Sequence, residues 1–362
     1  MNFNRKLILA DGTVFPGNGF GQQSEVACEV IFHTGMTGYE DILTDGTYYG
    51  QAVVMTYPLI GNYGISQEVI DAPANGLSAL IVKEYCEIPS NWQSVATLDS
   101  TLKVKNIVGL CDVDTRALTI KIREAGTMRG IIVDFNVSTE EAISRLVTIP
   151  EITDQAQQVT MKASYRVVVK KKKHKILYIA FGAKNEAIID ELTDRDCEVI
   201  IMPFFHTTLD EITKINPNGV ILGNGPGNPA DLEILTLVDK VVKNYPTFGI
   251  GLGHQLVAVV GKARVSKMKF GHHGNNIPVR DVNTGRTLIT SQNHNYVVDQ
   301  ESLVTTDFEV SHFAINDETV QGIKHKFLPV FGVQFMPEVH TGPADSKYLF
   351  DQFINSLAGG VE

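Results

Sequence analysis

The sequence contains few cysteines, and none of them lies close to another. Cys28, Cys86, Cys111 and Cys197 are the only four in 362 residues, and no CxxC spacing occurs. This arrangement indicates neither a zinc site nor a disulfide framework. We therefore expect reduced thiols, as is typical of a cytoplasmic protein.

Positive charge and long apolar runs are also scarce. The sequence has 31 Lys and Arg residues against 41 Asp and Glu residues, a formal net charge of -10. Nucleic acids and anionic membranes both select for basic surfaces, so we expect neither as a partner. The N-terminal apolar run, Leu7–Ala10, is too short for a signal peptide or a membrane span, and no later run is long enough. Proteins or small molecules are the expected partners.

Residues 1–150 are predicted to form a mixed domain rich in β structure, the first of two domains that the chain length suggests. Apolar runs predict strands at Leu7–Leu9 and Glu25–Phe32. Apolar spacing and a terminal glycine predict a helix from Thr115 to Gly126, and a second helix follows at Val137–Leu146.

Residues 33–65 are dense in glycine, aromatic and hydroxyl side chains. This composition is typical of tight turns between strands. An alternative is that Thr47 and Tyr48, in the turn DGTYYG, face a ligand.

Residues 151–175 are predicted to be a linker. They are polar, with a glutamine-rich patch at Gln155–Gln158 and a basic run at Lys170–Lys173. In an acidic chain such a run indicates the solvated end of a linker rather than a binding patch.

Residues 176–362 form the second predicted domain, in which strands and helices alternate. The apolar runs predict strands at Lys175–Ala180, Glu198–Met202, Gly219–Leu222 and Phe248–Ile250, with helices at Ala183–Leu192, Thr208–Thr213 and Asp231–Lys243. Such alternation predicts an α/β fold with a doubly wound parallel sheet. Ligands of these sheets bind outside the carboxyl ends of the strands, where two glycine-rich loops, Gly223–Pro229 and Gly249–His254, are expected to converge.

The second loop lies in the stretch Thr247–Gly261, which has the pattern of a nucleophile elbow. A short apolar strand meets three alternating glycines, and a helix-like apolar repeat follows. In such an elbow small residues let a reactive side chain project from a strained turn. The reactive position is Gly251, which has no side chain, so the turn has the geometry of covalent catalysis without the nucleophile.

A nucleotide site and a metal site are both disfavoured. Gly249, Gly251 and Gly253 form GxGxG rather than GxGxxG, and no acidic ribose partner follows about twenty residues on. The histidines of the second half show no HExxH-type spacing, so we expect no metal site.

A series of motifs resembles the small chain of carbamoyl phosphate synthetase, in order and with few length changes from near residue 7 to near residue 355. The matching segments are TGMTGYEDILTD, TYPLIGNYG, DVDTRALTIKIREAGTMRG, NGPGNP, GLGHQLVAVVGKA, KMKFGHHGNN, SQNHNYVVD and VQFMPEVHTGPAD. The resemblance implies a family-type N-terminal domain followed by a class I, triad-type glutamine amidotransferase domain.

The resemblance also implies a function and a partner. Small chains of this family hydrolyse glutamine and pass ammonia to a large chain, which makes carbamoyl phosphate for pyrimidine and arginine synthesis. ATP, bicarbonate and magnesium would be bound by that large chain, so no cofactor is expected in this one.

The catalytic positions carried over from the family are degenerate. The family nucleophile is a cysteine at the position of Gly251, and the family base is a histidine at the position of Met336. The orienting carboxylate remains as Glu338. A thioether cannot accept a proton at neutral pH, so Glu338 has no base to orient.

Neighbouring positions also depart from the family pattern. Gly223 replaces a serine, Asn228 an aspartate and Asn295 a glycine, while Ala180 and Asn185 replace an aspartate and an arginine. A single loss would be compatible with an engineered knockout. Several together indicate relaxed constraint on the glutaminase site.

Most of the implied glutamine-binding positions remain compatible with an amide ligand. The resemblance assigns backbone amides near Gly225 and Leu252 to an oxyanion hole, and such donors do not depend on side-chain identity. We expect glycine at 251 to leave a void for water or a small ligand, and the fold to accept cysteine there. The implied binding residues are Thr47, Gly225, Gly227, Leu252, Gln255, Asn293, Asn295 and Tyr296.

Three functions follow as alternatives. The favoured one is a non-hydrolytic small chain that forms a heterodimer with a large chain, shaping or regulating it while ammonia comes from solution. The second is a working glutaminase, which needs a substitute nucleophile. Cys197 lies in another strand region and His340 lies beyond the proline of its motif, so neither is a good substitute. The third is a free-standing paralogue that binds an amide metabolite.

Overall fold

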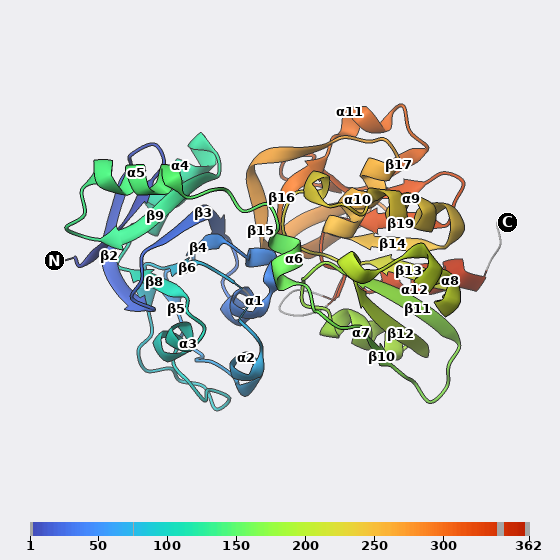
Figure 1. Ribbon diagram of the computed structural model, residues 1–362, viewed down its shortest axis with the longest axis horizontal. Helices are drawn as coiled ribbons and strands as arrows, with labels where there is room; N and C mark the ends of the chain where they lie inside the picture. The colour runs from blue at the N-terminus through green and yellow to red at the C-terminus, as the bar shows by residue number, and fades with distance from the viewer. Residues whose placement is uncertain (1–2, 75, 339–343, 359–362) are drawn as a thin grey trace. The chain divides into compact units, whose positions relative to one another are not determined.

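The computed structural model describes residues 3–74, 76–338 and 344–358, and the chain divides into two compact units (Figure 1). The first unit comprises residues 1–152 together with 269–274. The second comprises residues 153–268 and 275–362. The predicted fold class, a β-rich N-terminal domain followed by a domain built on a parallel sheet, is confirmed.

The first unit is built around a closed barrel in the order β1-β2-β8-β6-β4-β3-β9. Leu7 and Leu9 belong to one buried cluster, whereas Ile8 packs with Ala142 and Leu146 of a covering helix. This alternation is the period-two pattern of a strand with two buried faces. The barrel strands are β1 (Arg5–Leu9), β2 (Val14–Gly21), β3 (Val26–His33), β4 (Gln51–Met55), β6 (Ala79–Ile81), β8 (Val108–Cys111) and β9 (Met128–Asp134).

Helices surround this barrel, and a two-stranded sheet forms from β5 (Leu59–Ile60) and β7 (Glu84–Tyr85). The predicted helix with a terminal glycine runs from Thr115 to Ala125, and the Asp114 side chain caps its N-terminus. The helices are α1 (Tyr39–Thr44), α2 (Gln67–Asp71), α3 (Leu98–Val104), α4 (Thr115–Ala125) and α5 (Thr139–Thr148).

The second unit contains a 10-stranded sheet in the order β10-β12-β11-β13-β14-β19-β18-β17-β15-β16. The neighbours from β12 to β19 are parallel, which confirms the prediction for the centre of the sheet. The antiparallel strands on either side were not predicted. The strands are β10 (Tyr165–Val167), β11 (His174–Ala180), β12 (Cys197–Pro203), β13 (Gly219–Leu222), β14 (Thr247–Ile250), β15 (Val265–Asp281), β16 (Thr287–Val298), β17 (Phe308–Ala314), β18 (Val320–His325) and β19 (Val330–Val333).

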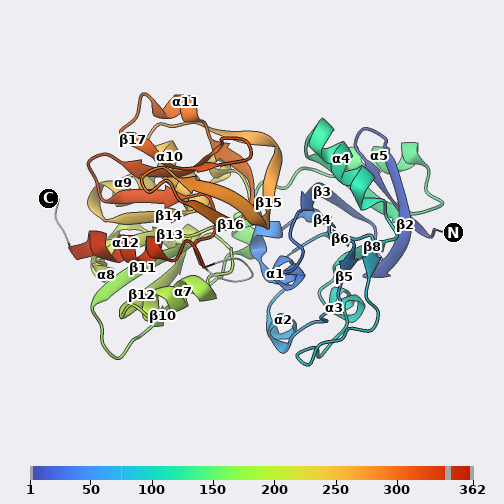
Figure 2. The same cartoon turned by 180° about the vertical axis from the view of Figure 1, so that it is seen from behind.

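Both faces of this sheet are covered by helices, as expected for a doubly wound fold. Leu177 and Ile179 of β11 join a core with α9 and α10, whereas Ile176 and Tyr178 join a second core with α7 and α12. Figure 2 shows α12, near the red end of the chain, in front of the sheet. The helices are α6 (Gln155–Val159), α7 (Glu186–Thr193), α8 (Leu209–Ile215), α9 (Leu235–Asn244), α10 (Leu252–Val260), α11 (Gln300–Leu303) and α12 (Tyr348–Ala358).

The segment predicted to be a linker contains two elements of the second unit, α6 and β10. Strand β10 pairs antiparallel with β12, where the buried carboxylate of Glu198 forms ion pairs with Arg166 and Lys172. Lys173 pairs with Asp196 at 2.7 Å. Lys172 and Lys173 are solvent-exposed, as predicted, and each also pairs with an acidic residue at or next to β12.

Candidate active site

Three adjacent parallel strands bring most of the predicted site residues together. Strands β13, β14 and β19 are neighbours in the sheet, and the glycine-rich loop, the elbow and the Met336 segment follow their carboxyl ends. The N–H of Gly251 donates to the carbonyl of Val333 at 2.8 Å. The N–H of Gly253 donates to the carbonyl of Gly223 at 3.1 Å. The convergence expected at this edge of the sheet is therefore present.

The elbow itself has the backbone expected of a strained turn. Strand β14 ends at Ile250, Gly251 adopts φ 55° and ψ -110°, and α10 begins at Leu252. A side chain at this φ is strained whatever space surrounds it. At Gly253 a β-carbon would meet the backbone of Leu222, so the third glycine permits close packing of the helix on β13.

The side chain of Asn224 occupies the space beside Gly251. A β-carbon placed on Gly251 would lie within 3.0 Å of the Asn224 atoms Oδ1, Cγ and Nδ2. Asn224 is 5% exposed, so its carboxamide is part of the interior. The expected void is therefore absent, and a cysteine at 251 would require the Asn224 carboxamide to rotate away.

Asn224 also binds the two amides that the family resemblance assigns to an oxyanion hole. The N–H of Gly225 donates to Asn224 Oδ1 at 2.9 Å, and the N–H of Leu252 donates to the same oxygen at 3.0 Å. Sequence reasoning missed this role, because no local pattern links residue 224 to residue 252.

Met336, which stands at the position of the family's catalytic base, follows strand β19. The N–H of Met336 donates to the carbonyl of Ser291 at 3.0 Å, which joins this segment to β16. Met336 is half-buried and Glu338 is buried. His340, which we considered as a substitute catalytic residue, lies outside the described residues.

The implied glutamine-binding residues on β16 lie beside α10. Gln255 donates from Nε2 to the carbonyl of Tyr296 at 3.0 Å and to Oε1 of Gln334 at 3.0 Å. The amide donors of Gln255 are thus engaged by the protein. Asn293 and Asn295 lie on the same strand, β16. Gln334, a second residue that sequence reasoning missed, is 2% exposed.

Thr47 belongs to the first unit. It lies in the short 3-10 helix Gly46–Tyr48, and its N–H donates to the Asp45 carboxylate at 2.8 Å. Its side chain is buried, and burial raises the pKa of the adjacent Tyr48 well above its ordinary value. These contacts agree with the turn expected here.

The remaining departures from the family pattern have local explanations in two cases. A β-carbon at Gly223 would meet the hydroxyl of buried Tyr178, so glycine fits this neighbour. Asn228 Oδ1 accepts from the N–H of Ala230 at 3.1 Å and caps a short 3-10 helix. Nothing in the structure explains Ala180 or Asn185.

Gly227, one of the implied glutamine-binding residues, has φ 97°, and a β-carbon there would meet Gln155 of α6.

The three buried cysteines are not activated as substitute nucleophiles. Burial raises the pKa of Cys197 to about 11 and those of Cys28 and Cys111 to about 12. The thiol form therefore dominates at neutral pH, whereas the thiolate is the reactive form. All four cysteines are free.

Neither a metal cluster nor a spanning helix is found in the described part of the chain. No group of three or more His, Cys, Asp or Glu residues within 3–74, 76–338 and 344–358 is placed to hold a metal ion. Within the same ranges, no helix has the length and apolar character needed to cross a membrane.

Two family models match the chain. Residues 7–132 match the model described as "Carbamoyl-phosphate synthase small chain, CPSase domain". Residues 178–356 match the model described as "Glutamine amidotransferase class-I".

Curated relatives match over nearly the whole chain. A "Carbamoyl phosphate synthase pyrimidine-specific small chain" from Halalkalibacterium halodurans is 46% identical, covering 98% of this chain and 97% of the relative. One of the same description from Bacillus subtilis is 45% identical, covering 98% and 96%. A "Carbamoyl phosphate synthase small chain" from Oceanobacillus iheyensis is 44% identical with the same coverage.

Proposed function

The chain belongs to the carbamoyl-phosphate synthase small-chain family, and we propose that within it this protein is a small subunit without glutaminase activity. In this proposal it binds a large chain that makes carbamoyl phosphate from free ammonia, and it shapes or regulates that chain. The observation that carries the proposal is Gly251, a residue without a side chain at the apex of an intact elbow.

Covalent hydrolysis of glutamine needs a nucleophile and a general base, and both positions lack the required chemistry. Gly251 offers no attacking atom, and the thioether of Met336 cannot take a proton at neutral pH. In a well-studied protease, loss of the nucleophile or the base alone lowers the turnover rate by about a million-fold. The buried Cys197 thiol does not replace the nucleophile, because burial raises its pKa to about 11.

Binding to a large chain is supported by the first unit. The small-chain family model matches residues 7–132, a range that reaches into every strand of the barrel. This part of the chain keeps its family pattern while the amidotransferase site does not. ATP, bicarbonate and magnesium would bind to the large chain in this proposal.

We assign the complex to pyrimidine rather than arginine synthesis. The support is the description of the Halalkalibacterium halodurans and Bacillus subtilis relatives as pyrimidine-specific small chains. A cytoplasmic location is part of the same proposal, and it agrees with the four free cysteines.

The proposal is tested with the purified chain and its cognate large chain. Sedimentation velocity at micromolar concentration should detect a complex. Carbamoyl phosphate should form with ammonium chloride, and glutamine freed of ammonia should give no more product than a blank without nitrogen donor. Glutamate release above the blank would instead establish a working glutaminase. Failure of the two chains to associate would favour the free-standing amide-binding paralogue.

A further inference from the structure

The N-terminus of α10 is capped by a residue from a distant loop. The first N–H groups of a helix have no acceptor within the helix. At Leu252, the first residue of α10, this acceptor is Asn224 Oδ1, which lies 28 residues earlier in the chain. The local N-cap residue, Gly251, has no side chain that could do this.

The same oxygen accepts from Gly225, so a single carbonyl oxygen serves two converging N–H donors. A carboxamide oxygen has two lone pairs, and both are directed to the protein in this arrangement. Paired backbone donors of this kind are what an oxyanion or an acyl oxygen would bind. Asn224 therefore stands where the acyl oxygen of a ligand would be held.

We propose that Asn224 is the specificity-determining residue of the elbow, and that its carboxamide is a built-in ligand that excludes acyl groups from the Gly225 and Leu252 amides. This inference goes beyond the proposed function, because it concerns the isolated chain and holds whether or not a large chain binds.

The absence of a side chain at 251 makes this arrangement possible. The three atoms nearest to a β-carbon placed there all belong to the Asn224 carboxamide. Any larger residue at 251 would have to rotate Asn224 away and release both amides. Glycine at 251 and the inward conformation of Asn224 thus depend on each other.

Amide hydrogen exchange tests the hydrogen bonds directly. With 15N-glycine and 15N-leucine labels, the Gly225 and Leu252 amides should exchange about tenfold faster in Asn224→Ala, since each loses its hydrogen bond to Asn224 Oδ1. Asn224→Asp keeps an acceptor oxygen and should preserve protection. The matched control is Asn228→Ala, because Asn228 lies in the same loop and its carboxamide accepts from the Ala230 N–H instead. It should leave both amides unchanged. Equal exchange in the unaltered chain and in Asn224→Ala would overturn the proposal.

A double-mutant cycle tests the proposed steric conflict between a side chain at position 251 and the Asn224 carboxamide. Gly251→Ala should lower the melting temperature in the unaltered chain, and it should lower it by less when Asn224→Ala is already present. Part of the loss should persist in both backgrounds, because alanine is strained at φ 55°. An equal loss in both backgrounds would contradict the proposed contact.

Glutamine itself tests the exclusion. At millimolar concentration it should leave the Gly225 and Leu252 amide resonances of the unaltered chain unshifted. A saturable shift of both resonances would show that a ligand displaces Asn224, and the proposal would fail. The three measurements use this chain alone, so their outcome is independent of whether the complex makes carbamoyl phosphate.

Discussion

The hydroxyl group of Tyr178 lies where a side chain at position 223 would begin. A β-carbon on Gly223 would come closer than 3.0 Å to the hydroxyl oxygen and ring carbon Cζ of Tyr178, a separation that real β-carbons essentially never show. Tyr178 is fully buried on β11, and β11 and β13 are hydrogen-bonded neighbours. Glycine at 223 therefore fits the buried Tyr178, whereas the family serine would collide with its hydroxyl group.

Gly223→Ser should destabilise the second unit by about 1–3 kcal/mol, the usual cost of overpacking a filled interior. The same substitution should cost less in a Tyr178→Phe background, because the hydroxyl group that is nearest to the new β-carbon is gone. Urea unfolding followed by circular dichroism measures both costs. Equal costs in the two backgrounds would show that Tyr178 is not what excludes the serine.

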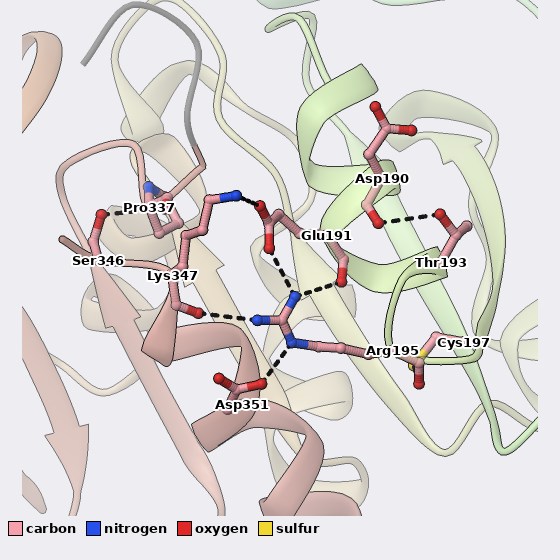
Figure 3. A network of polar contacts seen from close by, with 9 residues as sticks. All are labelled: Asp190, Glu191, Thr193, Arg195, Cys197, Pro337, Ser346, Lys347 and Asp351. Atoms are coloured by element: carbon pink, nitrogen blue, oxygen red, sulfur yellow. Dashed lines mark hydrogen bonds and ion pairs between the residues drawn. The ribbon is translucent and has the colours of Figure 1, made fainter. Parts of the chain in front are cut away.

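Arg195 joins α7 to α12 on one face of the second unit, as Figure 3 shows. Its guanidinium donates to the Glu191 carboxylate and to Asp351 Oδ1, both at 2.7 Å. Lys347 also pairs with Glu191. The side chains of Arg195 and Glu191 are 20% and 11% exposed, whereas that of Asp351 is 62% exposed. The Arg195–Glu191 pair is therefore expected to contribute more than the Arg195–Asp351 pair.

Arg195→Ala should lower the unfolding free energy by about 1–3 kcal/mol, because it leaves a largely buried carboxylate with fewer donors. Arg195→Lys should recover only part of this, since an ammonium cannot reproduce the planar guanidinium fork. The control is Asp351→Asn, whose exposed pair should be worth about 0–1 kcal/mol. Urea midpoints of the three variants give the comparison. If Asp351→Asn lowered the unfolding free energy as much as Arg195→Ala, the Arg195–Glu191 pair would not be the stronger of the two.

Acid should destabilise the chain through three buried histidines. Burial lowers the pKa of His33 and His254 to about 3 and that of His312 to about 4, against an ordinary value of 6.5. In the unfolded chain these three histidines become protonated as the pH falls through about 6.5, whereas in the folded chain they remain neutral. Their contribution to stability is therefore complete above pH 6.5 and is lost progressively as the pH falls toward 4, by about 1.4 kcal/mol per pH unit for each histidine.

His312→Gln should make this acid dependence shallower. Neutral glutamine can replace the contacts of the ring, which bonds to Ser311 Oγ at 2.9 Å and to the Tyr348 hydroxyl at 3.1 Å. The slope of unfolding free energy between pH 6 and pH 5 should fall by about 1.4 kcal/mol per pH unit. Urea titrations at pH 7, 6 and 5 measure it. An unchanged slope would mean that His312 is protonated in the folded chain.

The sequence predicted those parts of the fold that depend on local patterns. The strand at Gly219–Leu222 and the elbow at Gly251 follow from short apolar runs bounded by glycine, and the structure has both. Strand β15 was missed, because its 17 residues include a glycine- and histidine-rich segment without apolar alternation. The contacts of Asn224 and of Tyr178 with glycine positions were also missed. They join residues 27 and 45 positions apart, and they depend on side-chain conformations for which a single sequence holds no signal.

The last prediction is that two substitutions restore a reactive site. Gly251→Cys with Met336→His places a thiol on the elbow and an imidazole two residues before Glu338, which is buried. The new side chain at 251 must push the Asn224 carboxamide aside, which releases the Gly225 and Leu252 amides for an oxyanion. The thiol would stand at the N-terminus of α10, where a lowered pKa favours the reactive thiolate.

We expect mass spectrometry to find position 251 labelled by a glutamine-mimicking alkylator, and glutamine to slow this labelling. Turnover should remain poor, because Gly223 and Asn295 still depart from the family pattern. The matched control is Gly251→Cys with Met336→Leu, which keeps the thiol but supplies no base, so its labelling should be slow and insensitive to glutamine. If the folded cysteine–histidine variant is labelled at the same rate with and without glutamine, the site no longer recognises glutamine. The second unit would then have a purely structural role, because restoring the nucleophile and the base would not have restored recognition of the substrate.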